Sequence, residues 1–199
     1  MKSPTVMAGE PHYAVQDHAL DEALGRHFTR IHRIPLCIDV ASITPCFPES
    51  TAARPLLVHA PSNRGFKGSE LVRQAVESLR RRNVQFEYEE VTGRTHAEVV
   101  SAFSRADLVI DQMRVGSYGT VAVEAWALGK PVVCYALPEL KSGYPTDLPL
   151  VQANPMRLEA VLAEWLSDGE ARHQLGRASR AFAEHVHDAR VVAVSTDSV

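Results

Sequence analysis

The chain has 199 residues, of which 45% are hydrophobic and 23% are charged, as is ordinary for a globular protein with one core. A formal net charge of −3 gives no general attraction to nucleic acid or to membranes, so we expect no nucleic-acid partner. The three cysteines, without a C-x-x-C pair, indicate a reduced, cytoplasmic setting rather than a disulfide framework.

The first part of the chain shows only weak periodicity. Ala14, Leu20, Leu24 and Phe28 would share one side of a helix over residues 14–31. The stretch that follows is rich in Pro and Ser, which is typical of a linker or an irregular lead-in. We therefore assign residues 1–54 to a lead-in and residues 55–199 to one folded domain.

From Pro55 onward, apolar runs alternate with helical patterns. The runs predict strands at 55–60, 84–91, 106–111, 131–136 and 148–153. Helical spacing and capping residues predict helices at 68–82, from residue 95 onward, and at 119–128, 155–167 and 169–187. This alternation predicts an α/β fold, in which helices cover both faces of a parallel, Rossmann-like sheet.

Ligands of such sheets bind at the carboxyl ends of the strands, so the loops that follow the strands are the places to search. The loop after the first strand contains Asn63, Arg64, Gly65 and Lys67 and leads into a helix. A helix start attracts phosphate, and Arg64 and Lys67 would add charges that neutralise a diphosphate. The alternative is a surface loop with two solvated cations. The loop lacks the G-x-x-x-x-G-K-[ST] pattern of a P-loop.

The loop after the strand at 106–111 is also glycine-bracketed. Gly116, Ser117, Tyr118, Gly119 and Thr120 lead into the next helix, and backbone amides approach a ligand closely where a Cβ is missing. Ser117 does not lie in a G-x-S-x-G elbow, so a hydrolase triad has little support.

Glu124 is the one acid in the apolar stretch from Val115 to Tyr135. An unpaired buried carboxylate is costly, so we expect Glu124 to face a partner or a cleft. Paired ribose hydroxyls would suit a carboxylate, which accepts two hydrogen bonds. The alternative is a bond to a nearby Arg, Lys or backbone group.

Three segments together carry a family resemblance: VHAPSNRGFKGSE, SRADLVIDQ and GSYGTVAVEAWALGKPVV. They resemble the donor-binding, C-terminal half of GT-B-fold glycosyltransferases of the retaining group 1 family, over residues 35–187. The resemblance implies transfer of a sugar, with retention, from a nucleoside diphosphate sugar to an acceptor hydroxyl. It implies no metal cofactor.

The resemblance also implies roles for individual residues. Arg64 and Lys67 would neutralise the donor diphosphate, with Asn63 and Gly65 beside them in the donor loop. Residues 116–120 would surround the phosphates and the sugar. Glu124 matches the second acid of the family's E-x7-E motif, which holds the ribose. Gly116 stands where the first acid belongs, so sugar recognition must differ here.

The length of the chain departs from the family as well. We expect only the second of two Rossmann-like domains, and hence a fragment, a remnant or one subunit of a split enzyme. A second chain, or self-association, would then complete the site for an acceptor that is a sugar or is linked to a lipid or metabolite. Such a partner could bring this cytoplasmic chain to the inner membrane. The alternatives are a non-catalytic auxiliary protein that acts by nucleotide binding or association, and, with less support, an epimerase of related fold.

Overall fold

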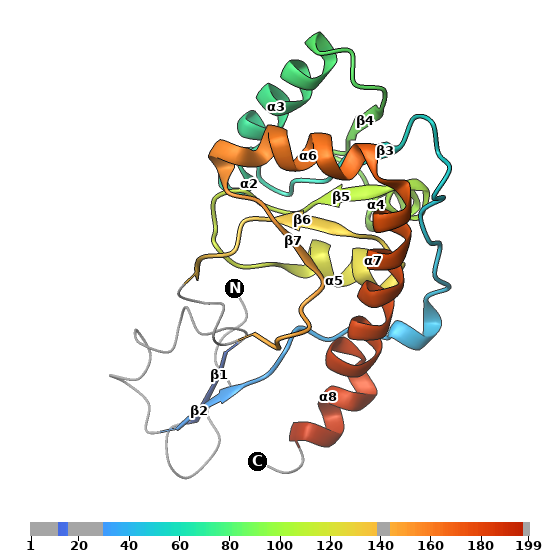
Figure 1. The fold of residues 1–199 in the computed structure, drawn as a ribbon. Helices are drawn as coiled ribbons and strands as arrows, with labels where there is room; N and C mark the ends of the chain where they lie inside the picture. Colours follow the sequence, from blue (N-terminus) through green and yellow to red (C-terminus); the bar gives the residue numbers. More distant parts are fainter. Residues whose placement is uncertain (1–11, 16–29, 139–143, 197–199) are drawn as a thin grey trace.

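The computed structural model describes residues 12–15, 30–138 and 144–196, and its centre is a five-stranded sheet (Figure 1). The strands lie in the order β4-β3-β5-β6-β7, and every neighbouring pair is parallel. They are β3 (Leu56–His59), β4 (Glu87–Glu90), β5 (Leu108–Ile110), β6 (Val132–Cys134) and β7 (Leu150–Gln152). The predicted parallel α/β sheet is thus confirmed, with β4 at one edge.

Helices connect the strands at the predicted places. They are α2 (Arg64–Lys67), α3 (Ser69–Arg81), α4 (His96–Arg105), α5 (Thr120–Ala127), α6 (Leu158–Ser167), α7 (Gly169–Phe182) and α8 (Ala189–Thr196), with short helical turns at Val40–Ser42, Pro155–Arg157 and Ala183–His187. Thr95 and Glu98 form the expected capping box at the start of α4. Two of the described helices were not predicted: the short helix α2, which precedes α3, and α8, which follows the turn at Ala183–His187.

Alternate residues of each strand face opposite sides of the sheet, and each side carries its own core. Val58, Val109 and Val132 face α4 and α5, where Phe103 and Trp126 are fully buried. Leu57, Leu108 and Val133 pack with apolar residues of α3 and α6 on the other side. Figure 1 shows these two helices against the sheet. This double coverage explains why the strands read as continuous apolar runs.

The prediction of a helix over 14–31 was wrong at both ends. The strands β1 (His12–Val15) and β2 (Arg30–Arg33) pair in parallel as a small sheet apart from the main one (Figure 1). Both segments are extended because their backbones bond to each other, a long-range pairing that helical spacing cannot reveal. The rest of that range lies outside the described residues.

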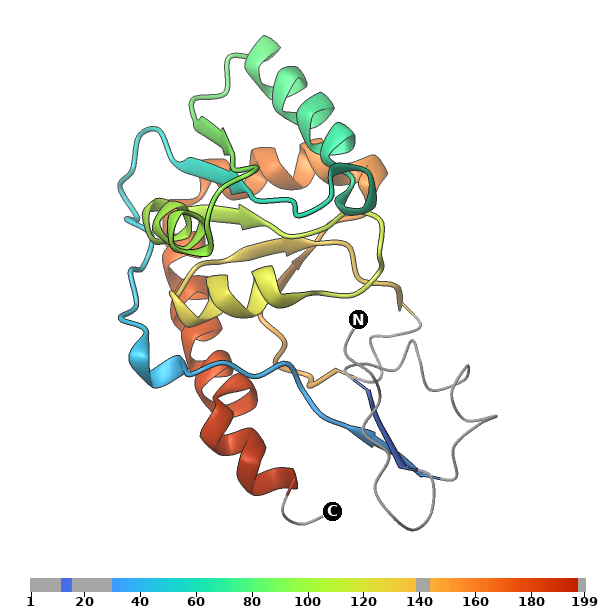
Figure 2. The ribbon, with the colours of Figure 1, turned by 180° about the vertical axis from the view of Figure 1, so that it is seen from behind.

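The Pro- and Ser-rich segment runs from β2 along one side of the molecule to β3 (Figure 2). Val40 is fully buried, and the Cys46 amide donates to the Leu128 carbonyl at 2.8 Å. The backbone of Ile38 bonds to both His187 and Ala189. In the described parts of the chain, no helix has the length and apolarity to cross a bilayer.

Candidate functional site

The loops after β3 and β5 meet at the carboxyl edge of the sheet, because these two strands are parallel neighbours. The Met113 amide donates to the Lys67 carbonyl at 3.0 Å. Between them lies Gly68, at φ +75°, where a Cβ would stand 3.1 Å from Met113 Cβ and strain the backbone. The short helix α2 is therefore fixed against the segment that follows β5.

Lys67, Asp111, Gln112 and Gly119 form what we call the inner cluster. The Lys67 ammonium donates to Asp111 Oδ1 and to Gln112 Oε1, both at 2.8 Å. The other oxygen of Asp111 accepts from the Gly119 amide at 2.7 Å. The Lys67 side chain is 12% exposed and that of Asp111 is fully buried. One carboxylate thus joins a cation from the first loop to the start of α5.

The start of α5 carries the partial positive charge of a helix N-terminus, and its first amides have no acceptor inside the helix. Asp111 engages the amide of Gly119, which directly precedes the helix, and the ammonium of Lys67 lies beside it. A Cβ on Gly119 would be only 3.4 Å from Lys67 Nζ, so the cation lies against the loop backbone. This grouping of a cation and helix-end amides suits a phosphate.

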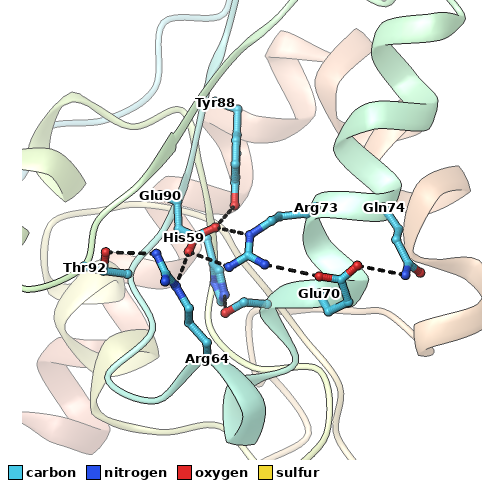
Figure 3. A network of polar contacts seen from close by, with 9 residues as sticks. His59, Arg64, Glu70, Arg73, Gln74, Tyr88, Glu90 and Thr92 are labelled. Atoms are coloured by element: carbon cyan, nitrogen blue, oxygen red, sulfur yellow. Dashed lines mark hydrogen bonds and ion pairs between the residues drawn. The ribbon is translucent and has the colours of Figure 1, made fainter.

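Arg64, Arg73, Tyr88, Glu90 and Thr92 form the outer cluster, at the end of the edge strand β4 (Figure 3). Glu90 accepts from Arg73 Nε and from Arg64 Nε, both at 2.9 Å. The hydrogen bonds from Arg73, and then those from Arg64, lower the pKa of Glu90 from its ordinary value near 4.5 to about 2. Burial raises the pKa of Tyr88, which donates to Glu90.

The structure therefore separates the two cations that the sequence placed together. Arg64 points to Glu90 and Thr92, with 60% of its side chain exposed, whereas Lys67 points to Asp111. Asn63, predicted beside the donor, uses its side-chain oxygen to cap α2 through the Phe66 amide. Gly65 is exposed in the same short helix.

The predicted glycine loop packs tightly onto the sheet. Gly116 has φ +89°, and a Cβ there would lie 2.6 Å from Leu137. The Ser117 carbonyl accepts a hydrogen bond from the side-chain amide of Gln112, and the Tyr118 ring contacts Trp126, Tyr144 and His187. Thr120, the first residue of α5, is exposed. Ser117 and Tyr118 thus hold the loop, while Gly119 at its end belongs to the inner cluster.

Glu124 lies one turn inside α5 and is bonded to α4. Its Oε1 is 2.8 Å from Nε2 of His96, and the two side chains are 17% and 73% exposed. The expectation of a partner is confirmed, although that partner is a histidine at the start of the neighbouring helix. The contact therefore lies at the surface, with most of the His96 side chain open to solvent.

Two buried ionisable residues, His59 and Cys134, lie behind the site. His59 lies at the end of β3, fully buried between the Ile110 carbonyl and the Ser69 hydroxyl. Burial lowers the pKa of His59 and raises that of the Cys134 thiol, so both remain neutral. Among the described residues, no group of three or more His, Cys, Asp or Glu side chains could hold a metal ion.

Sequence reasoning missed three members of this site: Asp111, Gln112 and His96. The signal for the first two was an apolar strand that ends in Asp-Gln, because polar side chains directly after a buried strand fall on the ligand-binding edge. His96 carried no such signal, since it reads as an exposed residue in the first turn of a helix.

Comparison with known proteins identifies a family for the chain. Residues 83–182 match the model of the group 1 glycosyl transferases, a segment that includes the glycine loop and Glu124. No curated protein sequence matches the chain.

Solved structures share the fold at low sequence identity. They include a sucrose-phosphate synthase from Thermosynechococcus elongatus, with 17% identity and a TM-score of 0.68. The match covers 94% of this chain and 57% of the synthase chain. WaaG, a glycosyltransferase of lipopolysaccharide biosynthesis, follows with 16% identity and TM-score 0.66, covering 94% and 62%. HepE from Anabaena, in complex with UDP and glucose, has 14% identity and TM-score 0.65, with the same coverage.

This chain therefore spans about three fifths of the length of the solved structures that it resembles. Its own fold is the Rossmann-like sheet shared with these GT-B glycosyltransferases, and the family match extends from just after α3 to the end of α7. The chain belongs to the group 1 glycosyl transferase family.

Proposed function

We propose that this chain is the donor-binding part of a glycosyltransferase that moves a sugar from a nucleoside diphosphate sugar to an acceptor hydroxyl, with retention. The observation that carries the proposal is the arrangement of Lys67, the start of α5 and Glu124 at one edge of the sheet. A cation and free amides suit the diphosphate, and a carboxylate one turn further suits the ribose.

The expected roles follow from position. Lys67 and the start of α5 stabilise the negative charge that grows on the leaving diphosphate, so no metal ion is required. Arg64 contributes by leaving Glu90 for the ligand, which its 60% exposure allows. Glu124 exchanges the exposed His96 for the ribose hydroxyls.

Gly116 cannot supply the acid that the family uses to contact the donor sugar. Its positive φ and the close approach of Leu137 leave no room for a side chain. We propose that the sugar is held by backbone amides of the loop instead.

The acceptor site requires a further domain. One of the similar solved structures is a complex of two proteins, GtfA and GtfB. We propose that a second chain, or a second copy of this one, supplies the acceptor-binding half, with a sugar or a lipid- or metabolite-linked molecule as acceptor.

The second candidate is a non-catalytic auxiliary protein that binds a nucleotide or associates with an enzyme. The observation that favours it is Gly116 in place of the family's first acid, because a donor sugar would be held less firmly. Sugar transfer on addition of a partner chain would separate the two candidates, because only the first predicts turnover.

Thermal-shift titration of the purified chain with UDP, GDP, dTDP and ADP tests donor binding. A nucleotide at 100 times its dissociation constant should add about 2.7 kcal/mol of stability. Glu124→Ala should weaken that nucleotide at least about tenfold while leaving the fold intact, because it removes a charged acceptor of two hydrogen bonds.

His96→Ala is the matched control. It breaks the same 2.8 Å contact from the other side and leaves the carboxylate free for a ligand, so nucleotide affinity should be kept. If Glu124→Ala and His96→Ala lowered stability equally and neither changed nucleotide binding, Glu124 would be a structural residue.

A further inference from the structure

We infer that Asp111 and Gln112 are positioning residues for the donor: together they hold the Lys67 ammonium against the start of α5, where the diphosphate binds. The inference rests on the proposed function, since it concerns how that site is prepared for its ligand. Neither residue belongs to the basic pair or to the two-acid motif of the family.

The Lys67 side chain is held from two directions. Its ammonium contacts Asp111 Oδ1 and Gln112 Oε1, both at 2.8 Å, and these acceptors come from consecutive residues directly after β5. An ammonium has three N–H donors, and the described residues engage two of them. The third N–H remains for an anion beside Gly119.

Gln112 is itself fixed. Its amide nitrogen donates to the Ser117 carbonyl, its backbone carbonyl accepts from the Tyr135 amide at 2.9 Å, and the residue is 3% exposed. The oxygen that Gln112 offers to Lys67 therefore has a defined direction. Lys67 is positioned by a rigid support rather than by a mobile surface acid.

Asp111 requires both of its carboxylate oxygens. One oxygen accepts from Lys67, and the other accepts from the Gly119 amide at 2.7 Å. An asparagine has the same shape but offers one oxygen and one NH2, so one of these two donors would face another donor. Asp111→Asn is thus a small change that breaks the junction between Lys67 and α5.

The sign of the effect on diphosphate binding tests the role. A carboxylate next to an anion site repels a diphosphate, so a purely electrostatic Asp111 would weaken binding and its neutralisation would tighten it. A positioning Asp111 predicts the opposite, because a displaced Lys67 no longer meets the phosphate.

Isothermal titration calorimetry of the full chain measures this effect. The probes are whichever of UDP, GDP, dTDP and ADP stabilises the native chain most, and the matching nucleoside. Asp111→Asn should weaken the diphosphate at least about tenfold and leave the nucleoside unchanged. In a Lys67→Met background, Asp111→Asn should change diphosphate affinity by less than about twofold, because it acts through Lys67.

Gln112→Met provides a second variant, with one of the two acceptors removed and Asp111 kept. It should weaken the diphosphate about threefold, again without effect on the nucleoside. If Asp111→Asn does not fold, Gln112→Met alone tests whether these contacts position Lys67 for the diphosphate. As a direct readout without ligand, the 13C and 1H resonances of the Lys67 ε-methylene should move toward those of free lysine in both variants.

Three results would overturn the inference: unchanged or tighter diphosphate binding in the variants, equal losses for diphosphate and nucleoside, or unmoved Lys67 resonances. With the native chain still binding nucleotide, each of these leaves the proposed function standing. Failure of the native chain to bind any of the four nucleotides would instead remove the proposed function and this inference together.

Discussion

The inner and outer clusters lie on either side of β3, and each joins a cation of α2 to an acid at the carboxyl end of a neighbouring strand. Lys67 and Arg64 are three residues apart, yet their side chains are 12% and 60% exposed. Lys67 is held by buried groups beside α5, whereas Arg64 spans the surface to Glu90. Two cations of one short helix thus make contacts of different kinds, and the more buried of them, Lys67, is the one held by buried groups.

The largest effect should come from Lys67→Met in the inner cluster. It leaves the fully buried Asp111 carboxylate without its cation, which should lower the free energy of unfolding by about 3 kcal/mol. Arg64→Met is the matched change in the outer cluster and should cost less than about 1 kcal/mol, because the Arg64 side chain is 60% exposed and Glu90 still accepts from Arg73. Urea denaturation measures both, and equal losses would show that burial does not distinguish the clusters.

A smaller effect is expected from Gly116→Glu. This change places a glutamate where the family has its first acid, in the loop that ends at Gly119 of the inner cluster. The positive φ and the 2.6 Å approach to Leu137 should make this variant less stable by about 2 kcal/mol, without tighter sugar binding. Adding Leu137→Ala to Gly116→Glu should recover the part of the lost stability that comes from the clash with Leu137. A Gly116→Glu protein as stable as the native one in urea denaturation would contradict this account of the missing acid.

The effect of Glu90→Gln in the outer cluster should differ from the others in that it depends on pH. Because the folded-state pKa of Glu90 is about 2, below its ordinary value near 4.5, its stabilising contribution is complete above pH 4.5 and is lost as the pH falls toward 2. The native and Glu90→Gln proteins should therefore converge in stability across this window. Urea denaturation from pH 6 to pH 2.5 checks this, and a constant difference would assign the effect to packing.

The fold followed from the sequence because its signals are local. Apolar runs such as PLLVHA gave the strands, and Thr95 with Glu98 gave a helix start that the structure confirms. The small sheet of β1 and β2 was missed because its pairing joins residues about 18 positions apart along the chain. Local spacing carries no information about such a contact.

The site was only partly predictable for the same reason. Lys67, Gly119 and Glu124 were found from motif positions, and the structure brings Lys67 to Gly119. The separation of Arg64 from Lys67 depends on which acid each side chain reaches, Glu90 or Asp111, and these acids are 26 and 44 residues away along the chain. Side-chain direction within a four-residue helix is set by tertiary contacts that the sequence does not display.

The backbone of Ile38 bonds to the end of the helical turn Ala183–His187 and to the start of α8. Ile38 donates to His187 at 3.0 Å and accepts from Ala189 at 2.9 Å, so the chain enters and leaves the sheet domain at one point. A unit whose two ends meet can be inserted into a loop of another protein without stretching either. Residues 38–189 thus have their two ends side by side, and we expect a loop of another protein to accept this unit with both junctions at one place.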